Sequence, residues 1–271
     1  APPPPAIHVP QPPATGLDVT FLVTADPHFG ALVRRPREEK PIPIEQIHEN
    51  AVAEMNAMEG KEWPQPMGGL VARPRGLLVA GDLTDNGRLS EWEKLERYFG
   101  RSGTEGKLAM PVFESVGNHD RTEEDLVSAK VIERHGSTRY SWDWDGLHLI
   151  SLGDAPDNGG LAWLKKDLDA VGPNTPVALF LHYPLLGPWS KNNWFGDTGF
   201  RERLDAALER TNVVAMFHGH YHATGHYRWE GRDVFAPGSA KHRWRSFLAV
   251  RVTSEKIDVA CWDYEHRAWW W

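Results

Sequence analysis

The sequence predicts an α/β fold in a single domain. Apolar, β-branched runs that suit buried strands alternate with segments whose apolar residues recur at helical spacing. The chain has 271 residues, which is enough for one large α/β domain or two small ones. We find no internal repeat and no linker after residue 16. We therefore expect one domain over residues 17–271, preceded by a proline-rich tether at residues 1–16.

The first half of the domain predicts three strands and three helices in alternation. The expected strands are 17–25, 76–80 and 111–116, and the expected helices are 44–58, 90–99 and 123–134. Ser90 and Thr122 are expected to cap the second and third helices, because an acidic residue follows each of them three positions later. The proline-containing segments 30–43 and 63–75 are expected to be loops.

The second half predicts a hairpin, two further helices and a run of antiparallel strands. The hairpin, 141–152, turns at Asp145 and Gly146. Helices are expected at 160–171 and 200–210, with strands at 177–181, 213–217, 227–229, 233–236, 246–252 and 256–262. The segment 183–199 is expected to be a loop. We expect the three tryptophans at 269–271 to cover a sheet edge, since apolar side chains rarely stay exposed together.

Composition limits the possible partners. The net charge is −7 and there is no long basic run, which argues against duplex nucleic acid, although Lys241 to Arg245 forms a local basic cluster. Cys261 is the only cysteine, so neither an internal disulfide nor a cysteine metal site is expected. No apolar stretch approaches the roughly 18 residues of a membrane span. The start at Ala1 suits an exported chain, periplasmic or secreted, after signal cleavage; a trimmed chain and a cytoplasmic location are the alternatives.

Five apolar runs each end in a polar cluster: DPH, GD, GNHD, HYP and GHYH. In α/β sheets, ligands bind beyond the carboxyl ends of strands, where loops distant in sequence converge. We expect seven side chains to meet there: Asp26, His28, Asp82, Asn118, His182, His220 and His222. Their donors are oxygen and nitrogen only, which suits Zn, Fe, Mn or Ni. Seven donors are too many for one tetrahedral ion but enough for two ions, with Asp82 or a hydroxide as the bridging anion.

The ordered series D-x-H, GD, GNHD, a lone His and GH-x-H resembles the motifs of the calcineurin-like metallophosphoesterases over residues 26–222. The resemblance implies a two-sheet β-sandwich flanked by helices (αββα). It also implies that Asp26, His28 and His222 hold one ion, that Asn118, His182 and His220 hold the other, and that Asp82 bridges them. His119 matches the family's catalytic histidine, and Asp85 stands where relatives carry the aspartate that pairs with it.

Departures at three positions narrow the range of related subfamilies. Asn86 replaces the arginine with which phosphoprotein phosphatases grip the substrate phosphate, and Asp120 replaces their glutamate in GNHE, so a Ser/Thr protein phosphatase is not expected. Asp85 stands where purple acid phosphatases carry a tyrosine ligand, so charge-transfer colour is not expected either. Size and spacing are more similar to small bacterial phosphodiesterases, including the cyclic-nucleotide class. A diester also suits Asn86, since it bears one charge fewer than a monoester.

The expected function is therefore hydrolysis of phosphoric esters, most of all phosphodiesters, by a metal-bridging hydroxide with two Fe, Zn or Mn ions. Small-molecule or lipid-headgroup phosphoesters are the expected substrates. Alternatives are a phosphomonoesterase or nucleotidase on the same site, and a non-catalytic binding scaffold of the same fold. Packed His218 is expected to lie outside the site, while His226 or His242 could assist substrate binding. The expected substrate contacts are Asn86, Trp189, Trp194 and Phe195.

Overall fold

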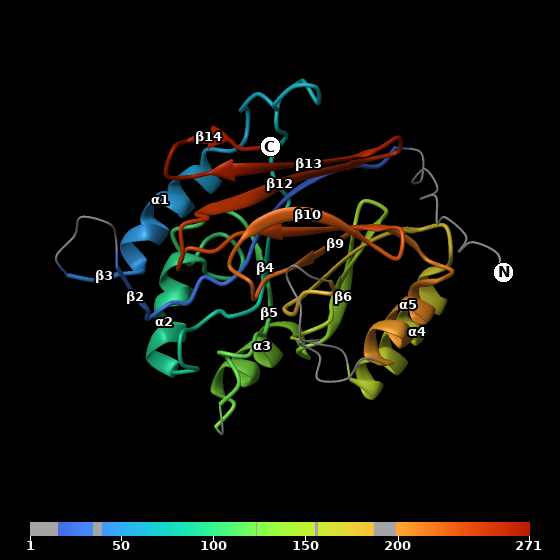
Figure 1. Cartoon of the computed structure of the whole chain (residues 1–271), viewed down its shortest axis with the longest axis horizontal. Helices are drawn as coiled ribbons and strands as arrows, with labels where there is room; N and C mark the ends of the chain where they lie inside the picture. Colours follow the sequence, from blue (N-terminus) through green and yellow to red (C-terminus); the bar gives the residue numbers. More distant parts are fainter. Residues whose placement is uncertain (1–15, 35–39, 123, 155–156, 187–198) are drawn as a thin grey trace.

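Two six-stranded sheets stack face to face in this computed structural model (Figure 1). The structure describes residues 16–34, 40–122, 124–154, 157–186 and 199–271. The strand order is β14-β13-β12-β1-β4-β5 in the first sheet and β10-β11-β9-β8-β7-β6 in the second. Helices cover the outer face of each sheet, which gives the expected αββα sandwich in one domain. The proposed tether falls almost wholly outside the described residues.

Parallel strands at one end of the first sheet carry three of the motifs. Strand β1 (Asp18–Thr24) pairs in parallel with β4 (Leu77–Ala80), which pairs in parallel with β5 (Val112–Ser115). On the other side of β1 the pairing is antiparallel, through β12 (Ser246–Thr253), β13 (Ile257–Asp263) and β14 (Ala268–Trp269). Within the segment 30–43, expected to be a loop, β2 (Leu32–Val33) and β3 (Ile42–Pro43) form a short hairpin.

The second sheet contains four parallel strands between two antiparallel neighbours. Strands β6 (Tyr140–Trp144) and β7 (Leu147–Ser151) form the predicted hairpin around Asp145 and Gly146. Strands β7, β8 (Pro176–Leu181), β9 (Asn212–His218) and β11 (Arg232–Pro237) run parallel, and β10 (Thr224–Trp229) returns antiparallel to β11. The expectation that the last strands are all antiparallel is wrong for β11, and this matters for the site.

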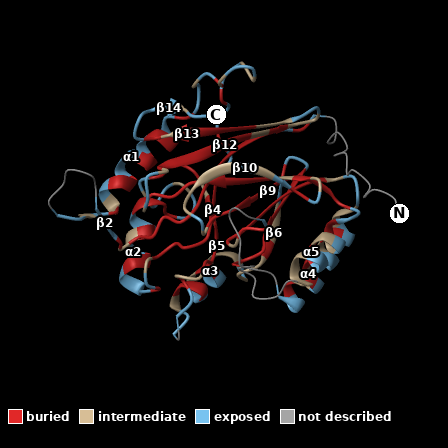
Figure 2. Cartoon of the chain, viewed as in Figure 1, coloured by how far each residue is buried: buried red, intermediate tan, exposed pale blue. Residues whose placement is uncertain are grey.

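Apolar residues bury the strands on both faces. In β1, Phe21 and Val23 face the second sheet, whereas Leu22 faces the helices, as the two-residue period of a strand requires. The helices α1 (Glu45–Asn56), α2 (Leu89–Tyr98) and α3 (Leu126–His135) pack on the first sheet, and α4 (Asn158–Val171) and α5 (Gly199–Leu208) on the second. Figure 2 shows buried strands inside and exposed outer helix faces.

Two predicted helix caps are wrong. Helix α2 starts one residue early, with Arg88 rather than Ser90 at the N-cap, and the Glu91 carboxylate accepts the Arg88 N–H (3.3 Å). Helix α3 starts after Asp125, because the chain first makes a turn in which the Thr122 carbonyl accepts the Asp125 N–H (3.0 Å). Both helices follow loops of the site, so the geometry of those loops sets where they begin.

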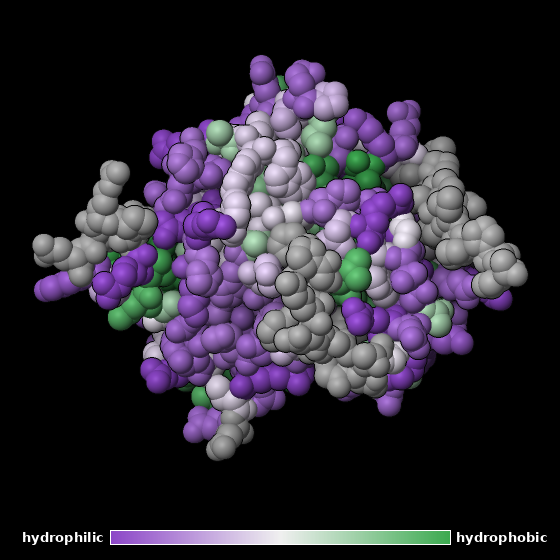
Figure 3. Space-filling model, in the orientation of Figure 1, coloured by the Kyte–Doolittle hydropathy of each residue, from purple (hydrophilic) through white to green (hydrophobic). Residues whose placement is uncertain are grey.

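The tail covers a sheet edge, as expected, through Trp269 and the backbone that follows it, whereas the side chains of Trp270 and Trp271 stay exposed. Trp269 lies in β14 against β13 and stacks on Trp63 with ring centroids 5.7 Å apart. The Trp270 N–H donates to the carbonyl of Cys261 (2.8 Å), which extends the pairing. On the face drawn in Figure 3, hydrophilic side chains predominate and hydrophobic ones gather in small separate groups. Among the described helices, none combines the length and apolar character that crossing a bilayer requires.

Candidate metal centre

Loops from both sheets bring the seven predicted ligands together. Asp26 and His28 follow β1, Asp82 follows β4 and Asn118 follows β5. From the second sheet, His182 follows β8, and His220 and His222 follow β9. Because the strands that carry these loops end at the same side of the sandwich, side chains nearly 200 residues apart become neighbours.

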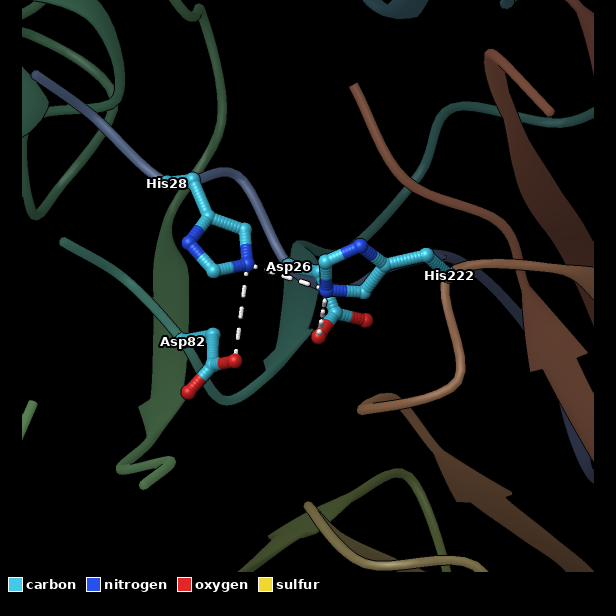
Figure 4. Close-up of side chains that lie close together, drawn as sticks. All are labelled: Asp26, His28, Asp82 and His222. Atoms are coloured by element: carbon cyan, nitrogen blue, oxygen red, sulfur yellow. Dashed lines mark hydrogen bonds and ion pairs between the residues drawn. The ribbon is translucent and has the colours of Figure 1, made fainter. Parts of the chain in front are cut away.

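Four of these residues form one set of converging donors, which we name the first donor group: Asp26, His28, Asp82 and His222 (Figure 4). Their donor atoms lie within 4.8 Å of one another. His28 Nε2 lies 3.0 Å from His222 Nε2 and 3.4 Å from Asp82 Oδ2. His222 Nε2 lies 3.3 Å from Asp26 Oδ1. Asp26, His28 and Asp82 are buried, so the cluster is closed on the protein side.

The second donor group consists of Asp82, Asn118, His182 and His220. Asp82 Oδ1 lies 3.3 Å from His182 Nε2. Asn118 Oδ1 lies 3.0 Å from His182 Nε2 and 2.8 Å from His220 Nδ1. Asp82 therefore belongs to both groups and turns one carboxylate oxygen toward each. This is the arrangement expected of a carboxylate between two cations.

The donor chemistry fits metal ions. His182 Nδ1 must donate to the Ala80 carbonyl (2.9 Å), so in the neutral ring the lone pair of Nε2 would face oxygen atoms of Asp82 and Asn118. Lone pairs that face one another in a buried site are unfavourable unless a cation lies between them. Burial opposes a charge on His182, yet attraction to Asp82 raises the pKa of His182 to about 9. The pocket therefore favours a positive charge at the place where the donors converge.

Backbone strain concentrates at this centre. Nine non-glycine residues in the described part of the chain have positive φ, and five belong to the donor groups: Asp26, His28, Asp82, His220 and His222. Such conformations are costly and persist where the surroundings enforce them. Hydrogen bonds between loops do so here: the His220 N–H donates to Asp26 Oδ1 (2.9 Å) and the His119 N–H to Asp82 Oδ1 (2.9 Å).

Two motif glycines allow the loops to approach closely. A Cβ at Gly117 would lie 2.3 Å from the amide nitrogen and Oδ1 of Asp82. A Cβ at Gly81 would lie 2.4 Å from His182 Nδ1, and Gly81 also has φ of 83°. A side chain at either position would push a donor away. The glycines of GD and GNHD are therefore explained by the packing of ligands from neighbouring loops.

The structure corrects the predicted role of Asp85. His119 Nδ1 lies 2.7 Å from the backbone carbonyl of Asp85, not from its carboxylate. The carboxylate instead lies 3.1 Å from His28 Nδ1 and 2.6 Å from Lys241 Nζ. Attraction to His28 and Lys241 holds the pKa of Asp85 well below its ordinary value. The His119 ring still lies next to the first donor group, with its centroid 4.6 Å from that of His28.

Of the other predicted residues, Asp120 supports the centre from behind. It is buried and accepts the backbone N–H groups of Leu83 (3.0 Å), Thr84 (2.9 Å) and Gly117 (2.8 Å). Burial and the nearby Asp82 raise the pKa of Asp120 to about 6.

The side chain of Asn86, a predicted substrate contact, is hydrogen-bonded within the protein: its amide donates to Glu91 Oε1 (3.0 Å). Trp189, Trp194 and Phe195 lie outside the described residues. His218 is buried, and its Nδ1 lies 2.9 Å from the Gly219 carbonyl, as in a packed histidine. His226 Nε2 lies 2.7 Å from Asp233 Oδ1 on β11.

Sequence reasoning gave no role to Lys241, and it ranked His242 only as a possible substrate contact. Both lie in the loop after β11; the His242 ring centroid is 4.8 Å from that of His222. The other loops were expected at the site because they follow the carboxyl ends of strands. The same rule would have included the loop after β11 if β11 had been expected to run parallel to β9. A strand assumed to be antiparallel would end at the opposite side of the sheet.

Comparisons with known proteins show which families and folds this chain resembles. The sequence profile described as calcineurin-like phosphoesterase matches residues 19–224. A probable glycerophosphodiester phosphodiesterase GpdQ of Arcobacter nitrofigilis is 26% identical over 195 residues, 64% of this chain and 66% of that protein. A probable cyclic nucleotide phosphodiesterase of Rhodococcus erythropolis is 28% identical over 162 residues, 56% of this chain and 52% of that protein. The matched part thus spans less than two thirds of either relative.

Among solved structures, a dimetal phosphatase from Danio rerio superposes with a TM-score of 0.61 at 12% identity. The superposition covers 89% of this chain and 98% of that one. At this identity the likeness shows a shared fold.

Proposed function

Because the chain belongs to the calcineurin-like phosphoesterase family, we propose that it is a metal-dependent hydrolase of phosphoric esters that acts on phosphodiesters. The observation that carries the proposal is the pair of donor groups joined by Asp82. All seven donors are present, which argues against a scaffold that has kept the fold and lost the site. Two relatives reported above are named phosphodiesterases.

The proposed division of roles follows the two groups. Asp26, His28 and His222 would hold one ion, Asn118, His182 and His220 the other, and Asp82 both. When bound, two such ions make hydroxide available near neutral pH and offset negative charge on the phosphoryl oxygens. Iron, zinc and manganese all suit this set of nitrogen and oxygen donors.

His119 is the proposed general acid. Its Nδ1–H donates to the Asp85 carbonyl (2.7 Å), which fixes the ring and turns Nε2 away from that contact. When protonated, His119 can donate its second proton from Nε2 to the departing oxygen. The Asp82 carboxylate, held by the His119 N–H at 2.9 Å, ties this acid to the bridging position.

The pairing of positive side chains with carboxylates around the centre favours a diester substrate over a monoester. Asn86 stands in place of an arginine, and its amide is engaged by Glu91. Lys241 is paired with Asp85 at 2.6 Å, and Arg121 with Asp154 at 2.9 Å. Since these positive charges are already compensated, a substrate with one negative charge suits the site better than one with two.

The test is hydrolysis by metal-stripped protein reloaded with Mn²⁺, Zn²⁺ or Fe²⁺. We expect turnover of bis(p-nitrophenyl) phosphate to exceed that of p-nitrophenyl phosphate, and to require metal. Asp82→Asn should abolish this turnover. Asp145→Asn, at an exposed position on the β6–β7 turn, should leave it unchanged. Equal diester hydrolysis with and without metal would refute the proposal. Glycerophosphodiesters and cyclic nucleotides, assayed next, would separate the two named classes of relative.

A further inference from the structure

The carboxylate of Asp85 lies between a candidate metal ligand and a lysine from another loop. Its Oδ1 is 3.1 Å from His28 Nδ1 and 2.6 Å from Lys241 Nζ. The contact with Lys241 is a hydrogen-bonded ion pair, whereas that with His28 is close but not a well-aligned hydrogen bond. His28 is fully buried, and the Asp85 side chain is 21% exposed. Asp85 thus closes the outer side of the His28 ring.

His119 does not need this carboxylate. The backbone carbonyl of Asp85 already accepts the His119 Nδ1–H at 2.7 Å, and any residue at this position supplies a carbonyl. The side chain of Asp85 is consequently available for another purpose.

A carboxylate 3.1 Å from Nδ1 would favour the tautomer of His28 that keeps the proton on Nδ1. With the proton on Nδ1, the lone pair of Nε2 points into the first donor group, 3.0 Å from His222 Nε2 and 3.4 Å from Asp82 Oδ2. A histidine ligand has to be unprotonated at the nitrogen that binds the metal. We propose that Asp85, anchored by Lys241, is a positioning residue that holds His28 ready for the metal of the first donor group. This inference rests on the proposed function in taking His28 as a metal ligand.

Lys241 provides the anchor from a loop that is itself tied to the centre. The Ser239 hydroxyl donates to the carbonyl of Asp26 (2.9 Å) and accepts the Lys241 N–H (3.1 Å). The Ser239 N–H donates to the carbonyl of Trp244 (2.9 Å), which closes the loop into a tight turn. The ammonium group therefore reaches Asp85 from a fixed point on the second sheet.

Metal binding alone tests the role of Asp85. Mn²⁺ is titrated calorimetrically into metal-stripped wild-type and Asp85→Asn protein, with His222→Ala and Asn118→Ala marking the first and second sites. Partners of ligating histidines contribute about 10–100-fold to metal affinity, so we expect a loss of this size at the first site and none at the second. Unchanged affinity at the first site, or an equal loss at both sites, would overturn the proposal.

Two further measurements distinguish a role of Asp85 toward His28 from a role toward His119. In the metal-free protein, long-range ¹H–¹⁵N NMR should find the Nδ1–H tautomer at His28 and a larger share of the Nε2–H tautomer in Asp85→Asn. Any loss of turnover in Asp85→Asn should be recovered as Mn²⁺ is raised. A loss of turnover that persists at saturating Mn²⁺, with a shifted pH–rate profile, would show that Asp85 acts through His119 and would refute the proposal. Absence of hydrolysis in the wild type would refute the proposed function, whereas the titration would still decide this inference.

Variants of Lys241 test the anchor. Lys241→Arg should keep the first-site affinity, and Lys241→Met should lower it by less than Asp85→Asn does and have no further effect in the Asp85→Asn background. Lys256→Met is the matched control, since Lys256 forms a similar ion pair with Asp258 (2.9 Å) on β13. First-site affinity in Lys241→Met equal to or above that of the wild type would overturn the anchoring role, because charge repulsion between Lys241 and the metal would then outweigh positioning.

Discussion

Gly117→Ala is the sharpest single test of the centre. Gly117 does not have positive φ, so alanine fits its backbone, and the three nearest atoms to the new Cβ all belong to Asp82. The new Cβ would lie 2.3 Å from Asp82 N and Oδ1, against at least 3.4 Å for an ordinary contact. Asp82 must therefore retreat by about 1 Å, far beyond the roughly 0.2 Å that metal–ligand distances tolerate.

We expect this shift to lower kcat/KM for bis(p-nitrophenyl) phosphate about 100-fold or more, and to destabilise the fold by about 1–3 kcal/mol. The measurements are steady-state kinetics with Mn²⁺, bound metal by elemental analysis, and thermal unfolding. Gly159→Ala in α4 is the control, since its Cβ would meet its nearest atom at an ordinary 3.5 Å. Two bound ions and activity within threefold of wild type in Gly117→Ala would refute the reasoning from close approach.

Three other predictions concern different parts of the molecule. His119→Ala should lower kcat by about 10²–10⁴-fold while both ions stay bound, as checked by kinetics and elemental analysis. Chelation should lower Tm, since a ligand at about 100 times its Kd stabilises by about 2.7 kcal/mol per site; an unchanged Tm would contradict tight binding. Burial opposes a charge on His148, but Asp167 and Asp143 at 2.9 and 2.8 Å raise its pKa. That stabilisation is full below about pH 6.5 and is lost as pH rises through the raised pKa, so the Tm advantage over His148→Gln should shrink as pH rises above about 6.5.

The carboxyl ends of strands could be predicted because strands and their polar endings are local signals. Asp26, Asp82 and His182 each follow a short apolar run that reveals the strand before it. The glycines beside them mark close approach, although the sequence does not say what approaches: Gly117 contacts Asp82 from another loop.

Pairing direction and side-chain partners could not be predicted. Strand β11 looks the same in sequence whether it runs parallel or antiparallel to β9, so Lys241 was not placed at the centre. The partner of Asp85 depends on whether its carbonyl or its carboxylate faces His119, and only the three-dimensional path of the loop decides this. The helix starts were not predicted for a related reason. Where α2 begins depends on contacts with the preceding loop, in which the Asn86 N–H donates to the Glu91 carboxylate (2.8 Å).

Neither half of the chain contains a whole binding site. The donors Asp26, His28, Asp82 and Asn118 come before residue 120, and the three histidines His182, His220 and His222 come after residue 180. Metal occupancy therefore reports on assembly: a cut in the β6–β7 turn should give fragments that retain ions only after they have recombined. Because each cation would be gripped from both layers of the sandwich, loss of either layer should release the pair together.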